Sequence, residues 1–256
     1  MRFADTHCHF DFAQFDQKRD KLLASCKMSD IDLIVVPSTV RRGWDKIIEL
    51  CQSHHQLLPA LGLHPYFVAE HKEEHLDELD QYIALNDASV VAVGELGLDA
   101  FVDDMARQQY FFESQLLLAS KHKLPVILHS RKTHSLLIKY LKKHCLFGGV
   151  VHAFSGSKQE LERFVALGLK IGVGGVITWP NSTKTRKAIQ HAPLESLVLE
   201  TDSPDMPVVG EAKGQSTPLN VLRVFESLCA LRQETPEELS MALWNNSLAL
   251  YACDNV

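Results

Sequence analysis

Short apolar runs rich in β-branched residues alternate with helix-compatible stretches along the whole chain, and this alternation restricts the fold most. The runs are 31–36, 57–63, 90–94, 125–128, 149–151, 170–174 and 197–200, and Phe3-Ala4 ends a further short strand at the start. Continuous apolar runs of this kind are typical of buried parallel strands. Eight strands alternating with helices predict an α/β fold, a (β/α)8 TIM-type barrel, whose usual length of about 250 residues matches this chain.

The stretches between these runs have the apolar spacing of helices. We expect helices over 17–29, 43–54, 76–85, 107–122, 133–144, 158–167, 181–191, 218–231 and 236–251. An open doubly wound sheet is the alternative architecture, but it normally carries a glycine-rich phosphate loop after its first strand. Here His7-Cys8-His9 occupies that place. No linker, repeat or low-complexity segment divides the chain, so we expect a single domain over residues 1–256.

Charge and cysteine content narrow the function classes. The formal net charge is −6, which argues against a broad basic surface for coating nucleic acid but leaves room for a local phosphate site. None of the six cysteines forms a C-x-x-C pair, so we expect reduced cysteines rather than a disulfide framework. No signal peptide is visible, and no apolar run approaches the ~18 residues of a membrane span. We therefore expect a soluble cytoplasmic protein without membrane contact.

The residues that follow the predicted strands have the chemistry of metal ligands. His7 and His9 are two residues apart at the end of the first strand, so their side chains point to the same face. In a barrel of this kind the active site lies at the C-terminal ends of the strands. Six metal-capable side chains are predicted there, namely His7, His9, Glu95, His129, His152 and Asp202.

Six ligands exceed the four of a tetrahedral zinc site and suit two divalent ions about 3.5–4 Å apart. Glu95 is the natural bridge between them because a carboxylate has two oxygens. One ion would then bind His7, His9 and Glu95, and the other would bind Glu95, His129 and His152. Asp202 would ligate an ion or hold the attacking water. The donors suit Zn²⁺, Mn²⁺, Mg²⁺, Fe²⁺, Co²⁺ or Ni²⁺, and the sequence does not choose among them.

The motifs at these positions resemble those of the TatD family of metal-dependent hydrolases, described as deoxyribonucleases, within the amidohydrolase-like barrels. The matching stretches are Asp5-Thr6-His7-Cys8-His9, Gly62-Leu63-His64-Pro65, Gly94-Glu95-Leu96-Gly97-Leu98-Asp99, Leu128-His129-Ser130-Arg131, His152-Ala153-Phe154-Ser155-Gly156 and Glu200-Thr201-Asp202-Ser203-Pro204. Asp205-Met206-Pro207 looks like the YjjV-like branch. The resemblance covers nearly the whole chain and implies the same six metal ligands, with His64 lining the site.

Two departures from the family pattern concern the substrate more than the chemistry. Tyr66-Phe67 follows His64-Pro65 where many relatives carry another histidine or an acid. Asp202 is followed by Ser203-Pro204-Asp205, where the DNA-acting branch more often has Ala-Pro-Tyr. We expect His64 and Arg131 to contact a substrate phosphate. The alternatives are a structural histidine and an arginine paired with an acid at a helix start.

The resulting hypothesis is metal-assisted hydrolysis with Glu95 and Asp202 as catalytic residues, Asp202 acting as general base. We expect a phosphate-containing substrate, DNA ends or short single strands, and a monomer is a plausible assembly. A C–N or ester hydrolase acting on a small amide or an aminoacyl ester such as aminoacyl-tRNA is the alternative, since the same centre serves a carbonyl. A third possibility is a non-catalytic binding protein that keeps the barrel. Loss of some metal ligands would indicate such a protein, and the complete set of ligands in this sequence argues against it.

Overall fold

A computed structural model describes residues 1–86 and 89–251 of the chain. Eight parallel strands form one sheet in the order in which they occur along the chain. They are β1 (Phe3–Asp5), β2 (Ile31–Pro37), β3 (Leu57–Leu61), β4 (Ala92–Asp99), β5 (Val126–Arg131), β6 (Gly149–Val151), β7 (Lys170–Val173) and β8 (Leu197–Leu199). The predicted barrel is confirmed.

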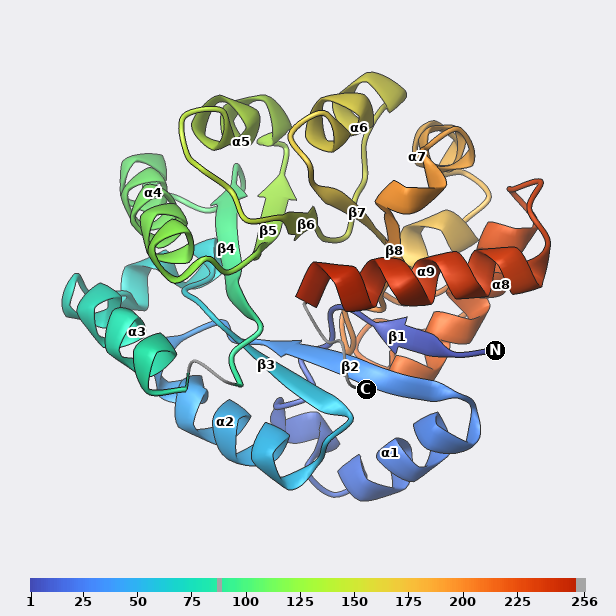
Figure 1. Cartoon of the computed structure of the whole chain (residues 1–256), viewed down its shortest axis with the longest axis horizontal. Coiled ribbons are helices and arrows are strands. Elements are labelled where there is room, and N and C mark those ends of the chain that lie inside the picture. The colour runs from blue at the N-terminus through green and yellow to red at the C-terminus, as the bar shows by residue number, and fades with distance from the viewer. Residues whose placement is uncertain (87–88, 252–256) are drawn as a thin grey trace.

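The helices surround the strands as an outer ring, except the last, which crosses one end of the barrel (Figure 1). They are α1 (Arg19–Met28), α2 (Trp44–Ser53), α3 (Glu74–Leu85), α4 (Met105–His122), α5 (His134–Leu141), α6 (Lys158–Val165), α7 (Thr183–Gln190), α8 (Val221–Cys229) and α9 (Pro236–Tyr251). Short 3-10 helices add η1 (Ala13–Phe15), η2 (Arg41–Gly43), η3 (Pro65–Glu70), η4 (Gly175–Thr178), η5 (Leu194–Ser196) and η6 (Pro218–Asn220). All nine predicted helices are present with boundaries that differ by a few residues.

The barrel closes where β8 meets β1, and polar side chains reinforce this seam. The Thr6 amide donates a hydrogen bond of 2.9 Å to the carbonyl of Leu199. The buried Asp5 carboxylate accepts one bond from the Thr201 amide at 2.9 Å and another from the Thr201 hydroxyl at 2.6 Å. The first and last strands are thereby tied together at the end of the barrel that carries the predicted ligands.

Two apolar clusters hold the barrel. Ala4, Leu33, Val35, Ala60, Ala92, Ile127, Val150 and Val198 form the inner one, against which Trp244, Leu250 and Tyr251 of α9 pack. A larger cluster lies between the strands and the outer helices. Buried apolar surface contributes about 25 cal/mol per Å², so both clusters stabilise the scaffold without help from the polar site. α9 runs across one end of the barrel in Figure 1.

β4 is longer than predicted. The sequence suggested a strand that stops at Gly94, yet the strand continues through Glu95 to Asp99. The glycines of this strand permit close approach to the next strand: a Cβ on Gly97 would lie 2.0 Å from the His129 carbonyl oxygen of β5. Glu95 and His129 are consequently held inside strands rather than on the loops after them, on a more rigid support.

The cysteines and the helices bear on the predictions about disulfides and membrane contact. Cys8, Cys26, Cys51, Cys145 and Cys229 are free, so no disulfide joins the cysteines that the structure describes. Cys253 lies outside the described residues. Within 1–86 and 89–251, no helix is both long and apolar enough to cross a membrane.

Candidate metal centre

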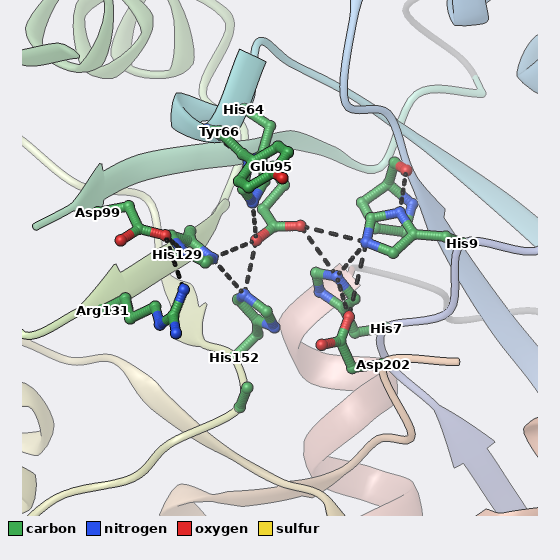
Figure 2. A network of polar contacts seen from close by, with 12 residues as sticks. His7, His9, His64, Tyr66, Glu95, Asp99, His129, Arg131, His152 and Asp202 are labelled. Carbon is green, nitrogen blue, oxygen red and sulfur yellow. Dashed lines mark hydrogen bonds and ion pairs between the residues drawn. The ribbon is translucent and has the colours of Figure 1, made fainter. Parts of the chain in front are cut away.

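All six predicted ligands converge at the C-terminal end of the barrel, with Glu95 in the middle (Figure 2). His7 and His9 follow β1, Glu95 lies in β4, His129 in β5, His152 directly after β6, and Asp202 after β8. All but His129 and Asp202 are buried, and these two are partly exposed. The barrel thus brings together residues that are dispersed over most of the sequence.

One oxygen of Glu95 faces the first and last strands. Its Oε2 lies 3.1 Å from His7 Nε2 and 3.5 Å from His9 Nε2. Those two imidazole nitrogens are 3.4 Å apart. Asp202 Oδ1 completes the group, at 3.4 Å from His7 Nε2 and 3.6 Å from His9 Nε2. His7, His9 and Glu95 therefore form one group of close donor atoms, and Asp202 forms another with His7 and His152.

The other oxygen of Glu95 faces the middle strands. Its Oε1 lies 2.9 Å from His129 Nδ1 and 2.6 Å from His152 Nε2. The two histidine nitrogens are 3.3 Å apart. Because the two carboxylate oxygens serve different groups, the arrangement has the form expected for a bridging carboxylate.

The donor set fits divalent ions. Ligands about 2.0–2.2 Å from a tetrahedral ion lie roughly 3.3–3.6 Å from one another, close to the spacings around Glu95 Oε2. That oxygen is buried and lacks a hydrogen-bond partner, although His7 Nε2 is only 3.1 Å away. An unpaired buried carboxylate oxygen is costly unless a cation satisfies it. Imidazole nitrogens and carboxylate oxygens close together around it are ligands that suit first-row divalent metals.

Hydrogen bonds on the far side of two imidazoles select the ring nitrogen that is free to ligate. His9 Nδ1 lies 3.3 Å from the Pro37 carbonyl, to which it donates, so in the neutral ring the lone pair is on Nε2. His129 Nε2 lies 3.3 Å from Asp99 Oδ2, which leaves His129 Nδ1 for an ion. Carbonyl and carboxylate partners of this kind orient metal-binding histidines and raise their basicity.

Asp99 is a functional residue that the sequence reasoning missed. It is buried, and although burial raises its pKa, hydrogen bonds from His129 and the Phe101 amide hold the pKa of Asp99 below its ordinary value. It is therefore ionised at neutral pH and attracts the His129 ring. The sequence carries a signal for it, because residues 95, 97 and 99 share one face of a strand, but only if the strand extends beyond Gly94.

His64 contacts the centre through Glu95. The Tyr66 amide donates to His64 Nδ1 at 2.9 Å, so the proton of the neutral ring is on Nε2, which donates to Glu95 Oε1 at 2.9 Å. Burial lowers the pKa of His64 to about 4, so the ring is neutral at pH 7. His64, Glu95 and His129 lie close enough together to hold an ion, but in this hydrogen-bond arrangement His64 Nε2 donates to Glu95 Oε1 and supports that carboxylate. Its contact with a substrate stays a prediction.

The charges of the cluster are strongly coupled. Burial raises the pKa of Glu95, but His152, His64 and His7 outweigh it and hold that pKa well below its ordinary value. Burial lowers the pKa of His9 and His152, yet the adjacent Glu95 carboxylate reverses the effect and raises them to about 9 and about 10. Burial keeps the pKa of His7 well below its ordinary value. Glu95 is the anion around which the other groups are organised.

Asp202 connects this cluster to an open cleft. Its side chain is 15% exposed and lines the cleft, while Oδ1 faces His7 and His9. No helix begins at Pro204 in the described structure, so there is no helix N-terminus there for Asp202 to cap. Burial raises the pKa of Asp202, against the lowering effect of His152 and His9. Glu200 lies deeper, fully buried, and accepts a hydrogen bond from the Ala153 amide, which holds the turn after His152.

The cleft beside the centre has a volume of about 810 Å³ and carries three cationic side chains. Arg131, Lys132 and Lys184 line it. Arg131 is 57% exposed and lies 3.9 Å from Asp99, a distance beyond hydrogen bonding. The guanidinium of Arg131 thus forms only a long, largely solvent-exposed ion pair with Asp99, which agrees in part with the alternative of an arginine paired with an acid and leaves its hydrogen-bond donors available to an anion. Lys184 pairs more closely, with Glu160 at 3.2 Å. The predicted contact of Arg131 with substrate remains untested, but its position at the metal centre agrees with it.

Comparisons with known proteins agree with this site. A family model described as TatD related DNase matches residues 4–252. YjjV from Escherichia coli K12, named an uncharacterized metal-dependent hydrolase, is 47% identical, and the match covers 98% of each chain. An uncharacterized metal-dependent hydrolase from Haemophilus influenzae is 40% identical over 98% of this chain and 100% of its own length.

Solved structures have the same fold. The crystal structure of YjjV, described as a TatD homolog, superposes with a TM-score of 0.95 over 98% of each chain. A TatD family hydrolase from Entamoeba histolytica reaches a TM-score of 0.87 at 22% identity and shares the barrel.

Proposed function

The chain belongs to the TatD-related DNase family of metal-dependent hydrolases, and from that premise we propose that it cleaves phosphodiester bonds in DNA with two divalent ions. The arrangement of Glu95 carries the proposal: one oxygen faces His7, His9 and Asp202, and the other faces His129 and His152. Divalent ions held there supply Lewis-acid chemistry, lowering the pKa of water towards about 7 and neutralising charge on a phosphoryl oxygen.

The protein's own residues provide the remaining steps. The Asp202 carboxylate reaches both the cluster and the cleft, so it orients the attacking water and accepts its proton. Arg131 donates to the non-bridging oxygens of the phosphate, a role for which its planar guanidinium is suited. His64 donates to Glu95 Oε1 and holds that carboxylate in place. Glu95 in turn fixes the distance between the two groups of ligands.

A phosphodiester is favoured over a carbonyl substrate because of the charge in the cleft. The chain as a whole carries a formal net charge of −6, yet Arg131 and Lys132 lie together beside the metal centre. Arg131 makes only a long ion pair of 3.9 Å with Asp99 and is 57% exposed, so its hydrogen-bond donors can bind a polyanion. Lys132 is exposed beside it. DNA ends or short single strands fit a local site of this size better than a long duplex, which needs an extended basic surface.

The test is a substrate panel with metal-loaded protein. We expect chelator-sensitive release of nucleotides from a short single-stranded oligonucleotide and hydrolysis of bis(4-nitrophenyl) phosphate. Glu95→Gln, purified in the same way, controls for contaminating nucleases and should be inactive. Hydrolysis of aminoacyl-tRNA without cleavage of any phosphodiester would contradict the proposal and favour the ester-hydrolase alternative.

A further inference from the structure

An exposed phenyl ring lies in the cleft beside the metal centre. Phe101 is 63% exposed and lines the same cleft as His129 and Asp202. A single exposed apolar residue is ordinary on a protein surface, but one inside the cleft of a polar active site is available to a ligand. Ala100 and Met105 continue the apolar wall on either side of it.

The ring stands on a loop that is held by buried hydrogen bonds. The Phe101 amide donates to Asp99 Oδ1 at 2.8 Å. Gln108, which is buried at the start of α4, accepts from the Asp99 amide at 2.8 Å and donates to the Val102 carbonyl at 2.9 Å. Because these bonds fix the backbone on both sides of Phe101, the ring is presented to the cleft by a rigid support. A preorganised side chain loses little conformational entropy when a ligand binds to it.

Arg131 lies on this ring and adds positive charge to it. The centre of its guanidinium is 4.2 Å from the centroid of the Phe101 ring, a cation–π contact. Lys132 follows, exposed and lining the cleft. An apolar plane covered by a planar cation, with a second cation next to it, suits a ligand that is both flat and anionic. A small inorganic anion would use the cations and leave the phenyl ring without a role.

We propose that Phe101 and Arg131 form a subsite that stacks the nucleobase of a nucleotide adjoining the scissile phosphate, with Lys132 facing the neighbouring phosphate. This inference rests on the proposed phosphodiesterase function and specifies how its substrate is recognised. Bases in single strands stack on aromatic rings and on arginine guanidinium planes, and such stacking tolerates any base. The subsite would therefore select nucleic-acid strands over other phosphodiesters without reading their sequence.

The experiment compares two hydrolysis-resistant ligands on the metal-loaded protein by titration calorimetry. One is a phosphorothioate-linked thymidine trinucleotide, and the other is the same chain with abasic sugars. Stacking contributes about 1–3 kcal/mol per base, so Phe101→Ala should raise the Kd of the base-containing chain about 5- to 100-fold. The Kd of the abasic chain should change much less, and Phe101→Trp should restore tight binding of the base-containing chain.

Phe147→Ala is the matched control. Phe147 is also an exposed phenylalanine, at 45%, but it does not line the cleft, so its loss should leave both Kd values unchanged. Equal weakening of the two chains by Phe101→Ala, or no weakening at all, overturns the subsite. If base-dependent binding is found but no phosphodiester is hydrolysed, the proposed phosphodiesterase activity is wrong and the base-stacking subsite is supported. If DNA is cleaved but Phe101→Ala changes the Kd of the base-containing and the abasic chain equally, the phosphodiesterase activity is supported and the base-stacking subsite is wrong.

Discussion

Asp202 occupies a backbone conformation that few residues adopt. Its φ is +54°, in the left-handed region, where Asp and Asn are tolerated better than other non-glycine residues. Asparagine can therefore replace it with little strain, while losing the capacity to accept a proton. This makes the substitution a selective probe of chemistry rather than of folding.

We expect Asp202→Asn to lower kcat by about 10²–10⁴-fold, the usual contribution of a positioned general base. The unfolding midpoint of the metal-free protein should stay close to that of the wild type. Asp205→Asn is the control, because Asp205 lies three residues later on the same turn and is exposed. Steady-state kinetics at saturating metal measures the effect of the substitution on kcat. A kcat within about threefold of wild type would show that Asp202 is not the general base.

Asp99 acts on the centre through His129, so its substitution should affect one ion more than the other. Asp99→Asn keeps an acceptor oxygen but removes the charge that attracts His129 Nε2. Removing a group that orients a metal-binding histidine costs about 10–100-fold in metal affinity. We expect the loss at the ion that binds His129 and His152, with the group around His7 and His9 retained. Metal titration followed by native mass spectrometry would resolve the two.

Asp103→Asn is the matched control for that experiment. Asp103 lies on the same loop and is exposed, and it also loses one negative charge on substitution. If both variants lose metal to the same extent, the effect is one of general charge, and the role assigned to Asp99 is wrong.

Helix α4 supports the site with two buried glutamines on one face. Gln108 bonds to the loop that follows β4, as described above. Gln115 accepts from the Leu63 amide at 2.7 Å and donates to the Leu63 carbonyl at 3.2 Å, directly before His64. Residues seven apart share a helix face, so the helix holds two active-site loops at once. In a sequence these glutamines look like ordinary helix formers.

We expect Gln115→Leu to destabilise the fold by about 1–3 kcal/mol, because it leaves the amide and carbonyl of Leu63 buried without partners. Urea unfolding of the metal-free protein measures this directly. Gln81→Leu on α3 serves as control, since Gln81 is exposed. A free energy of unfolding that falls equally in both variants would assign the loss to the leucine rather than to the hydrogen bonds.

At the same scale, the sequence predicted the elements better than their ends. Apolar runs identified seven of the strands because these are short, rich in β-branched residues and largely buried, and the eighth was placed from Phe3-Ala4 before the histidine pair. The predicted strand stops at Gly94 because the apolar run stops there, before the charged Glu95, and only the neighbouring strand shows that the backbone continues in close contact through Gly97. The six metal ligands could be predicted from the sequence because only a few residue types, here His, Glu and Asp, bind divalent ions. The stacking of Arg131 on Phe101 was not, since it depends on loop conformation.

For the molecule as a whole, metal binding should be linked to protons. With His9 and His152 at pKa values of about 9 and about 10, both rings carry protons at neutral pH when no ion is bound. A histidine must lose its proton to ligate, so protons are released on binding and the Kd for the metal falls as pH rises towards those values. Calorimetry of Mn²⁺ binding in two buffers of different ionisation enthalpy counts the protons. A Kd that does not change between about pH 6 and pH 8 would contradict this linkage.

The seam between β8 and β1 also determines when the protein becomes active during its synthesis. Asp5 and Thr201, which join there, are 196 residues apart, and the ligands on either side of the seam are separated almost as widely. A ribosome that adds about 5–20 residues per second needs roughly 10–40 s to cover that distance. The nascent chain therefore carries His7 and His9 long before it carries Asp202. Hydrolytic activity that needs the complete set of ligands therefore arises only after the segment that carries Asp202 has been synthesised.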